Sequence, residues 1–314
     1  MKTITLSLLF SLFLFYFPIR AQDIKVGDSR ANYPYPWAGG MNECQFGRID
    51  LDFDGIKDLI AFDRTGNRLM PFLVEDTGTG LQFEYAPEYA ELFPTMVDWM
   101  ILKDYDGDGL EDIFTYSPGV AGMKVYKNVS TSEIKFDLFI SPFLTSFQGG
   151  GYTNILVTYV DYPAIEDLDG DGDLDILTFW GLGSFVEYHK NLSFEKYGHT
   201  DSLDYEKVGL CWGYFAESEE SNVIYLDTCF GWKKNPAQVP PGDIRDYRHT
   251  GSTFRMIDLN DDGVLDLLLG DVDYASLVAL TNGGTKDSAY MISQDWNFPQ
   301  GSRNINLFSM PVTL

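Results

Sequence analysis

Aspartate residues recur at one fixed spacing in four segments of this chain. Each segment has oxygen-bearing side chains at positions 1, 3, 5 and 9 and a glycine at position 6, and the segments are residues 50–58, 104–112, 167–175 and 258–266. Three short oxygen-bearing side chains at alternating positions can converge on a hard cation, and Ca²⁺ takes about six to eight oxygen ligands. The glycine permits a sharp turn after the third of them. The repeated spacing therefore predicts four calcium-binding loops.

The predicted ligands are the side chains at positions 1, 3, 5 and 9 and the main-chain carbonyl of position 7. They are Asp50, Asp52, Asp54, Ile56, Asp58, Asp104, Asp106, Asp108, Leu110, Asp112, Asp167, Asp169, Asp171, Asp173, Asp175, Asp258, Asn260, Asp262, Val264 and Asp266. We expect about four bound Ca²⁺ ions with a structural role. The fourth loop carries the neutral Asn260 and is expected to bind more weakly than the third, because ligand charge contributes to calcium affinity.

The residues around the loops exclude an EF-hand. An EF-hand loop needs a glutamate at position 12 and a helix on each side, whereas position 12 here is Ala61, Thr115, Thr178 or Leu269. Each loop instead runs into a short apolar stretch, and a second apolar stretch begins 18 or 19 residues after the first aspartate. Short apolar runs between Gly, Asp and Asn indicate buried strands, although their periodicity alone does not exclude short helical pieces. The predicted unit is strand, calcium hairpin, strand, turn and strand.

The spacing between the loops indicates the architecture. The loops start at residues 50, 104, 167 and 258, so the intervals are 54, 63 and 91 residues. Repeats of about 40 to 50 residues or somewhat more, with several strands each, are typical of propeller blades. The strands after the loops are apolar on both faces, as a sheet between two others requires. We therefore predict an all-β fold, a β-propeller of four-stranded blades with calcium-binding hairpin loops and an insertion at about 195–247.

At the level of motifs, the chain resembles the FG-GAP or VCBS family of propeller repeats, the calcium-loop blades also found in integrin α-chains. The resemblance rests on the D-x-D-x-D-G-x-x-D loop before an apolar strand and covers roughly residues 40–290. Residues 248–253 and 280–285 also look like phrases in secreted Bacteroidetes repeat proteins associated with type IX secretion. The resemblance implies a calcium-stabilised propeller that works as a binding or adhesion module.

The N-terminus predicts export. Residues 1–21 have the pattern of a signal peptide, with Lys2, an apolar core over 5–17 and a small residue, Ala21, before a polar lead-in. The apolar core is short for a membrane span, so a retained signal anchor is the lesser alternative. We expect residues 22–314 to form the mature chain, secreted or on the cell surface, with no membrane insertion after cleavage.

The chain is strongly acidic, with a formal net charge of −25 that becomes −27 once Lys2 and Arg20 are removed with the signal peptide. This charge argues against nucleic acid and anionic membrane surfaces as partners. The loops hold 15 of the aspartates at side-chain ligand positions. Four Ca²⁺ ions would return about eight positive charges. The acidity is therefore interpreted mainly as a consequence of metal binding.

Three cysteines in an exported chain indicate an oxidising compartment. Cys211 and Cys229 both lie in the insertion, and we predict a disulfide between them, worth about 3 kcal/mol if unstrained. Cys44 is then left over, either buried and free or paired outside this chain.

The sequence shows little catalytic machinery. It has no G-x-S-x-G, H-E-x-x-H, P-loop or C-x-x-C motif. Of the three histidines, His189 is expected to be a structural partner within a strand, His199 to be exposed and His249 to fix a turn. Most aromatic residues are expected in the core, and Trp212 and Trp232 are the better candidates for an exposed sugar-stacking patch. No catalytic residues are assigned.

These features favour a calcium-stabilised propeller that acts as a binding or adhesion scaffold for a protein or glycan ligand, without catalysis of its own. The alternative is a carbohydrate-binding module attached to a polysaccharide-degrading enzyme, and the second alternative is a catalytic propeller with a cluster of acids or histidines outside the loops. Four loops are few for a propeller, since a seven-bladed ring needs roughly 400 residues. We therefore expect this chain to be part of a larger ring, with a compact ring closed by residues 30–49 as the alternative.

Overall fold

The fold belongs to the larger of two units into which the chain divides, Met1–Gly39 and Gly40–Leu314. The computed structural model describes residues 35, 38–181, 184–218, 223–229, 252–271, 274 and 277–299. The predicted signal peptide, Trp232 and His249 lie outside these residues.

Three of the sheets have the predicted four-stranded form, with every neighbouring pair antiparallel and the strands in chain order. The first contains β1 (Cys44–Ile49), β2 (Asp58–Asp63), β3 (Arg68–Asp76) and β4 (Leu81–Tyr85). The second contains β5 (Met100–Lys103), β6 (Asp112–Ser117), β7 (Gly122–Asn128) and β8 (Phe136–Ile140). The fourth contains β17 (Ser252–Ile257), β18 (Asp266–Asp271), β19 (Val278–Asn282) and β20 (Met291–Asp295).

The third sheet is larger than the sequence predicts. Its four antiparallel strands are β11 (Ala164–Glu166), β12 (Asp175–Phe179), β13 (Val186–Asn191) and β14 (Tyr205–Gly209). The hairpin of β9 (Thr145–Phe147) and β10 (Tyr152–Asn154) extends this sheet, because β9 pairs with β14 in parallel. β14 lies within the predicted insertion, so part of that segment supplies the last strand of the blade. The remainder includes a separate hairpin of β15 (Phe215–Glu217) and β16 (Ile224–Leu226).

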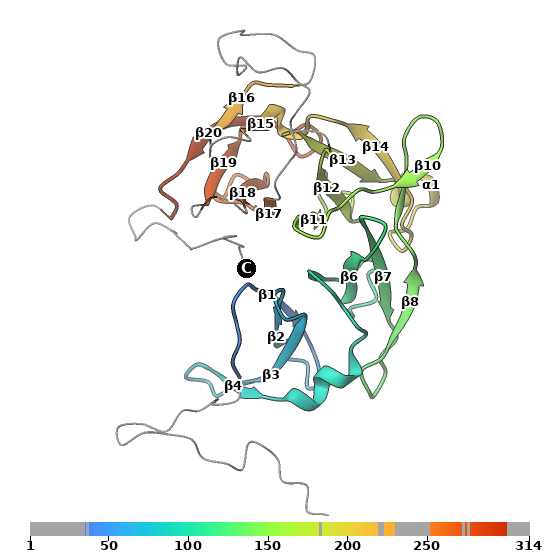
Figure 1. Ribbon diagram of the computed structural model, residues 1–314, viewed down its shortest axis with the longest axis vertical. Coiled ribbons are helices and arrows are strands. Elements are labelled where there is room, and N and C mark those ends of the chain that lie inside the picture. The colour runs from blue at the N-terminus through green and yellow to red at the C-terminus, as the bar shows by residue number, and fades with distance from the viewer. Residues whose placement is uncertain are drawn as a thin grey trace, which may run out of the picture. The chain divides into compact units, whose positions relative to one another are not determined.

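Helices are few and short: η2 (Pro87–Leu92), α1 (Ser193–Tyr197) and η3 (Trp212–Tyr214). None of the helices in the described part of the chain has the length and apolar character needed to cross a membrane. The four sheets are arranged as the blades of a β-propeller (Figure 1), which confirms the predicted all-β propeller fold.

Buried side chains join consecutive sheets into one structure. The second strand of each sheet is buried on nearly all positions, as expected for a sheet with neighbours on both sides. One apolar cluster joins the first and second sheets, a second joins the second and third, and a third joins the third and fourth. In the last of these, the rings of Phe179 and Phe254 stack with centroids 4.3 Å apart.

A buried arginine also connects the blades through polar contacts. Arg64, just after β2, donates from Nε to the carbonyl of Asp98, at 2.7 Å, and from a terminal nitrogen to the carbonyls of Tyr159 and Val160, at 2.9 and 3.1 Å. The side chain is 7% exposed. Asp98 precedes β5 and the other two residues precede β11, so one guanidinium holds the entry segments of the second and third sheets against the first.

The predicted disulfide is present. Cys211 and Cys229 are bonded, with their Cα atoms 5.4 Å apart, and the bond closes the segment that contains the β15–β16 hairpin. Cys44 is a free, half-buried thiol at the start of β1. Burial raises the pKa of the Cys44 thiol, and the nearby Asp63 raises it further, so this sulfur stays protonated at neutral pH.

Candidate metal centre

Each aspartate loop occupies the same place in its sheet, the hairpin between the first and second strands. The loops join β1 to β2, β5 to β6, β11 to β12 and β17 to β18. The glycine at position 6 has a φ of +83° to +97° in all four loops, a conformation that costs glycine little. Position 4 is also left-handed, and in the first loop it is Phe53, at +64°. A bulky residue in that conformation is strained, so the loop geometry is strongly imposed.

The rim of each loop, meaning positions 1, 3 and 5, is held by hydrogen bonds from its own backbone. The position 1 carboxylate accepts from the amide of position 6 at 2.8 to 3.2 Å in every loop. The position 3 oxygen accepts from the amide of position 5 at 2.9 to 3.3 Å. The position 5 carboxylate accepts from the amide of position 7 at 2.7 to 3.1 Å. These side-chain-to-backbone turns fix the rim oxygens without any external partner.

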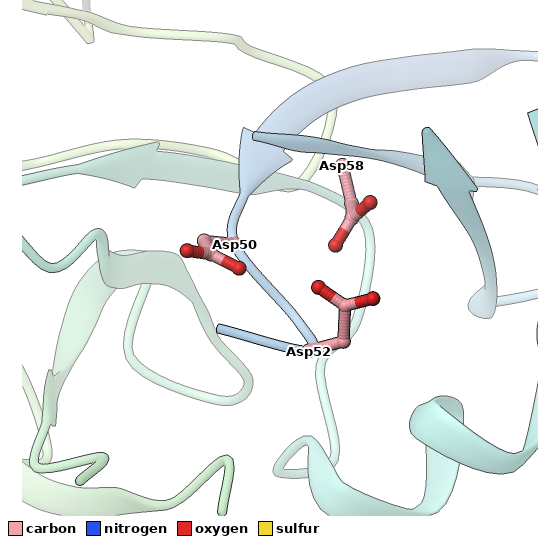
Figure 2. Close-up of side chains that lie close together, drawn as sticks. All are labelled: Asp50, Asp52 and Asp58. Atoms are coloured by element: carbon pink, nitrogen blue, oxygen red, sulfur yellow. The ribbon is translucent and has the colours of Figure 1, made fainter. Parts of the chain in front are cut away.

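In three loops the carboxylates converge. Ligand atoms lie within 4.8 Å of one another in three groups, which are Asp50, Asp52 and Asp58, then Asp104, Asp106 and Asp108, then Asp167, Asp169 and Asp171. Figure 2 shows the carboxylates of the first group pointing toward one another. A fourth group, Asp171, Asp173 and Glu195, adjoins the third loop. The fourth loop forms no such acidic group among the described residues, because Asn260 replaces one carboxylate.

The structure thus brings half of the predicted ligand residues together, and not identically in each loop. Asp54 is absent from the first group, where Asp58 takes part instead. In the second and third loops the rim residues converge and the position 9 residue does not join them. The amides of the position 7 residues donate to the position 5 carboxylates. The role of their carbonyls as ligands stays a prediction for Ile56, Leu110, Asp173 and Val264.

The position 9 residues, called the floor aspartates here, have a role that the spacing did not reveal. Asp58, Asp112, Asp175 and Asp266 are at most 1% exposed. One oxygen of each accepts from the amide of position 2, at 2.8 to 3.3 Å. The other accepts from an amide 16 residues further on, at 2.7 to 2.8 Å, in the third strand of the same sheet. Each floor aspartate therefore ties the hairpin to the third strand.

The electrostatics of the floor are unfavourable without a cation. The pKa of Asp112 is raised to about 7 and that of Asp175 to about 8, mainly by burial and in part by the other carboxylates of the same loops. Burial also raises the pKa of Asp58, with the same contribution from Asp52 and Asp54. A divalent cation at the rim would offset this repulsion, because an opposite charge nearby favours the ionised form.

Two loops contain a lysine among their carboxylates. Lys127 of β7 contacts Asp106, and its Nζ lies 3.9 Å from Asp108 Oδ2. Lys190 of β13 contacts Asp169, with Nζ 3.6 Å from Asp171 Oδ2, and it also contacts Glu195. Both lysines lie 15 residues after their floor aspartate, where the first and fourth sheets have Leu73 and Thr281. The offset of 15 residues can be read from the sequence. Only the register of the third strand shows that it places the lysine beside the rim carboxylates.

Two histidines and one tryptophan that the sequence singles out also lie in the described residues. His189 is fully buried, with Nε2 3.3 Å from Glu187 Oε2, which fits a structural partner. His199 is half exposed and stacks on Tyr197. Trp212 is partly buried and lines a cavity of about 660 Å³ beside the disulfide, together with Tyr188 and Tyr214.

No protein-family model and no curated protein matches this chain. The function of the protein is therefore inferred from the four loops and from the sheets that hold them.

Proposed function

We propose that this protein is an exported, calcium-stabilised β-propeller that serves as a binding or adhesion scaffold. The observation that carries the proposal is the hydrogen-bond network that recurs in all four loops and fixes their oxygen-bearing side chains in the same way. Such prepositioned carboxylates repel one another, and Ca²⁺ binding relieves that repulsion. The resemblance of the motif to FG-GAP or VCBS repeats supports the same interpretation.

The calcium ions in this proposal are structural. Each would be bound by the side chains of positions 1, 3, 5 and 9 and by the carbonyl of position 7. The position 9 carboxylate also accepts the backbone hydrogen bonds that close the hairpin. Extracellular modules work with weak sites, with dissociation constants of about 10⁻⁴ to 10⁻³ M. Because binding requires the folded loop, the binding free energy adds to the stability of the propeller.

Metal analysis of the mature protein after dialysis against calcium tests the proposal directly. We expect close to four ions per chain, one for each of the four loops. A result of one ion or none would contradict the assignment. In excess chelator the melting temperature should fall by several degrees. Added Ca²⁺ should restore it, whereas Mg²⁺ should restore it poorly because Mg²⁺ demands a tighter octahedral geometry.

A matched pair of variants separates metal binding from packing. Asp171→Ala removes a rim carboxylate of the third loop and should lower stability only when calcium is present. Asp137→Ala removes an exposed carboxylate of β8 that lies outside the loops and should show no calcium dependence. Equal loss for Asp171→Ala with and without calcium would show that the residue acts through the fold instead.

Carbohydrate binding is the second candidate function. It is favoured by the cavity of about 660 Å³ beside the disulfide, where Trp212, Tyr188 and Tyr214 gather with Lys286 and Asp287. Aromatic residues next to polar groups suit ligands that are apolar on one face and polar at the edge. Binding of the calcium-loaded protein to a glycan array, lost in Trp212→Ala, would support this role at that cavity.

A further inference from the structure

Polar side chains occupy one face of the third sheet where an apolar core is expected. Thr178 of β12 lies opposite Glu187 of β13, and His189 of β13 lies opposite Lys207 of β14, so the four share one face. Thr178, Glu187 and His189 are at most 5% exposed. Burying such groups costs free energy unless they find hydrogen-bond partners.

The same positions in other blades show that the fold does not need these polar residues. The residues equivalent to Thr178, Glu187 and His189 by strand register are apolar in the first and fourth sheets. They are Ala61, Met70 and Phe72 in the first sheet and Leu269, Val278 and Leu280 in the fourth. The second sheet has Thr115, Lys124 and Tyr126 at these positions. The buried glutamate and histidine are therefore particular to the third sheet.

Several of these polar atoms have no hydrogen-bond partner within the protein. They are both ring nitrogens of His189, the hydroxyl of Thr178 and the hydroxyl of Ser146 on β9, all buried. His189 Nε2 lies 3.3 Å from Glu187 Oε2, but the contact is not aligned as a hydrogen bond. Burial lowers the pKa of His189, so the ring is neutral and offers one donor and one acceptor. A further buried atom without a partner is Oδ1 of Asn154, and Asn154, unlike the three residues above, lines the neighbouring cavity.

A cavity opens next to this polar face, between the third sheet and the β9–β10 hairpin. Its volume is about 280 Å³, and the side chains around it include Gln148, Thr153, Leu156, Trp180, Glu187 and Lys207. This volume lies just below the range of about 300 to 1,000 Å³ that is typical of ligand pockets. The cavity is therefore suited to a ligand of one small ring rather than to a peptide.

The charges around the cavity favour a neutral ligand. Glu187 Oε1 lies 3.3 Å from Lys207 Nζ, and the other oxygen faces His189. The carboxylate and the ammonium thus balance each other, and neither an anion nor a cation would enter without displacing a partner. The amide of Gln148 and the hydroxyl of Thr153 both donate and accept, and Trp180 and Leu156 supply an apolar wall.

We propose that this cavity binds a neutral polyhydroxylated ring, the size of a single sugar residue, with its hydroxyls on Glu187, Lys207 and Gln148 and its C–H face on Trp180. Ring hydroxyls match this lining because each donates and accepts a hydrogen bond. The inference deepens the binding role proposed above and rests on it, but it does not depend on calcium in the loops.

The larger cavity beside the disulfide is the competing location for a sugar. None of the buried polar atoms that lack a partner, among the described residues, belongs to its lining. It also carries Lys286 and Asp287 at its edge. The smaller cavity is the better candidate because Asn154, whose buried Oδ1 lacks a partner, belongs to its lining. Trp212→Ala tests the larger cavity.

The experiment is titration of the calcium-loaded mature protein with methyl glycosides of glucose, galactose, mannose and xylose, followed by ligand-observed NMR and calorimetry. We expect at least one glycoside to bind saturably in the millimolar range or tighter. Trp180→Ala and Gln148→Ala should each weaken binding about tenfold or more. Trp296→Ala removes an exposed tryptophan that lines neither cavity and should leave binding unchanged. If Trp180→Ala does not fold, Gln148→Ala decides the question.

The proposal is overturned if no glycoside binds, or if Trp212→Ala removes binding while Gln148→Ala does not. Calcium content is measured on the same samples. Four ions without glycoside binding would refute the sugar site and leave the calcium proposal standing. Glycoside binding with one ion or none would do the reverse.

Discussion

The two middle loops, 104–112 and 167–175, and the two end loops, 50–58 and 258–266, share one backbone but balance charge differently. In the middle loops the ammonium groups of Lys127 and Lys190 lie among the rim carboxylates. The end loops have Leu73 and Thr281 at the same offset. The loop conformation is therefore independent of how its charge is neutralised. One turn therefore combines a buried floor aspartate, which stabilises the fold, with rim carboxylates that can bind a cation.

Substitution of a floor aspartate should have the largest effect, and it should be the same in middle and end loops. Asp112→Ala and Asp266→Ala each leave two amides without an acceptor, both buried for Asp112 and one of them partly buried for Asp266. Each buried unsatisfied group costs about 1 to 3 kcal/mol, so we expect a loss of roughly 2 to 5 kcal/mol. Chemical denaturation in excess chelator measures this loss, with the near-isosteric Asp112→Asn as the milder control. A loss confined to one kind of loop would break the comparison.

Removal of a strand lysine should sharpen the difference between the loops. Lys190→Met deletes the ammonium that contacts Asp169 and Glu195. The third loop should then bind Ca²⁺ more tightly, by about tenfold, because the competing positive charge is gone. Without calcium, the variant should be less stable than the parent. Calorimetric calcium titration gives both values.

Lys103→Met is the matched control for that variant. Lys103 has a similar exposure to Lys190 and pairs with Glu166 at 2.6 Å, outside the loops. It should leave calcium affinity unchanged. If both variants shift calcium binding equally, net charge rather than local competition is responsible.

The pH dependence of the metal-free protein should follow the floor aspartates of the middle loops. Their folded pKa values, about 7 for Asp112 and about 8 for Asp175, lie above the unfolded value of 3.8, mainly through burial. The folded state therefore binds protons more readily, and stability should rise as the pH falls from 9 through these two values toward the unfolded one.

Thermal melts in chelator at pH 6 and pH 9 should then differ by about a few degrees, with the higher melting temperature at pH 6. Calcium-loaded protein should reverse or flatten this trend, because bound metal favours ionised carboxylates. A metal-free protein that is more stable at pH 9 would contradict this prediction. It would mean that nearby positive charge already stabilises the ionised floor carboxylates.

The smallest effect is expected from converting an end loop into a middle loop. Thr281→Lys places an ammonium at the offset of Lys127 and Lys190 in the fourth sheet. The metal-free stability should change by about 1 kcal/mol or less, as is usual for exposed ion pairs. The calcium content should fall toward three ions, because the fourth loop is already the weakest. Four ions at unchanged affinity would show that a lysine at this offset does not compete with calcium.

Local spacing was sufficient to predict the parts of the molecule that are determined locally. Asp104, Asp106 and Asp108 with Gly109 predict their hairpin because the turn is made from its own side chains and backbone. The apolar runs after each loop predict buried strands for the same reason. The disulfide between Cys211 and Cys229 followed from position within one short insertion.

The rest depends on pairing between distant segments. Asp58 accepts a hydrogen bond from Val74 only once the third strand is in register, so its second role was invisible in the motif. The parallel pairing of β9 with β14 joins residues about sixty positions apart and has no signature in either segment. Glu187 and His189 looked like ordinary strand residues until the register placed them beside Lys207.

The hydrogen bonds of the Arg64 guanidinium affect the cooperativity with which the blades unfold. In an array of repeats that touch only their neighbours, stability is nearly a sum of local terms and the array can melt from one end. Arg64 instead donates to carbonyls that precede the second and the third sheets. Detaching either sheet removes carbonyl acceptors from this guanidinium, so partial unfolding costs more than the apolar contacts alone would require. The first three blades should therefore behave as a single cooperative folding unit, lost in one transition rather than blade by blade.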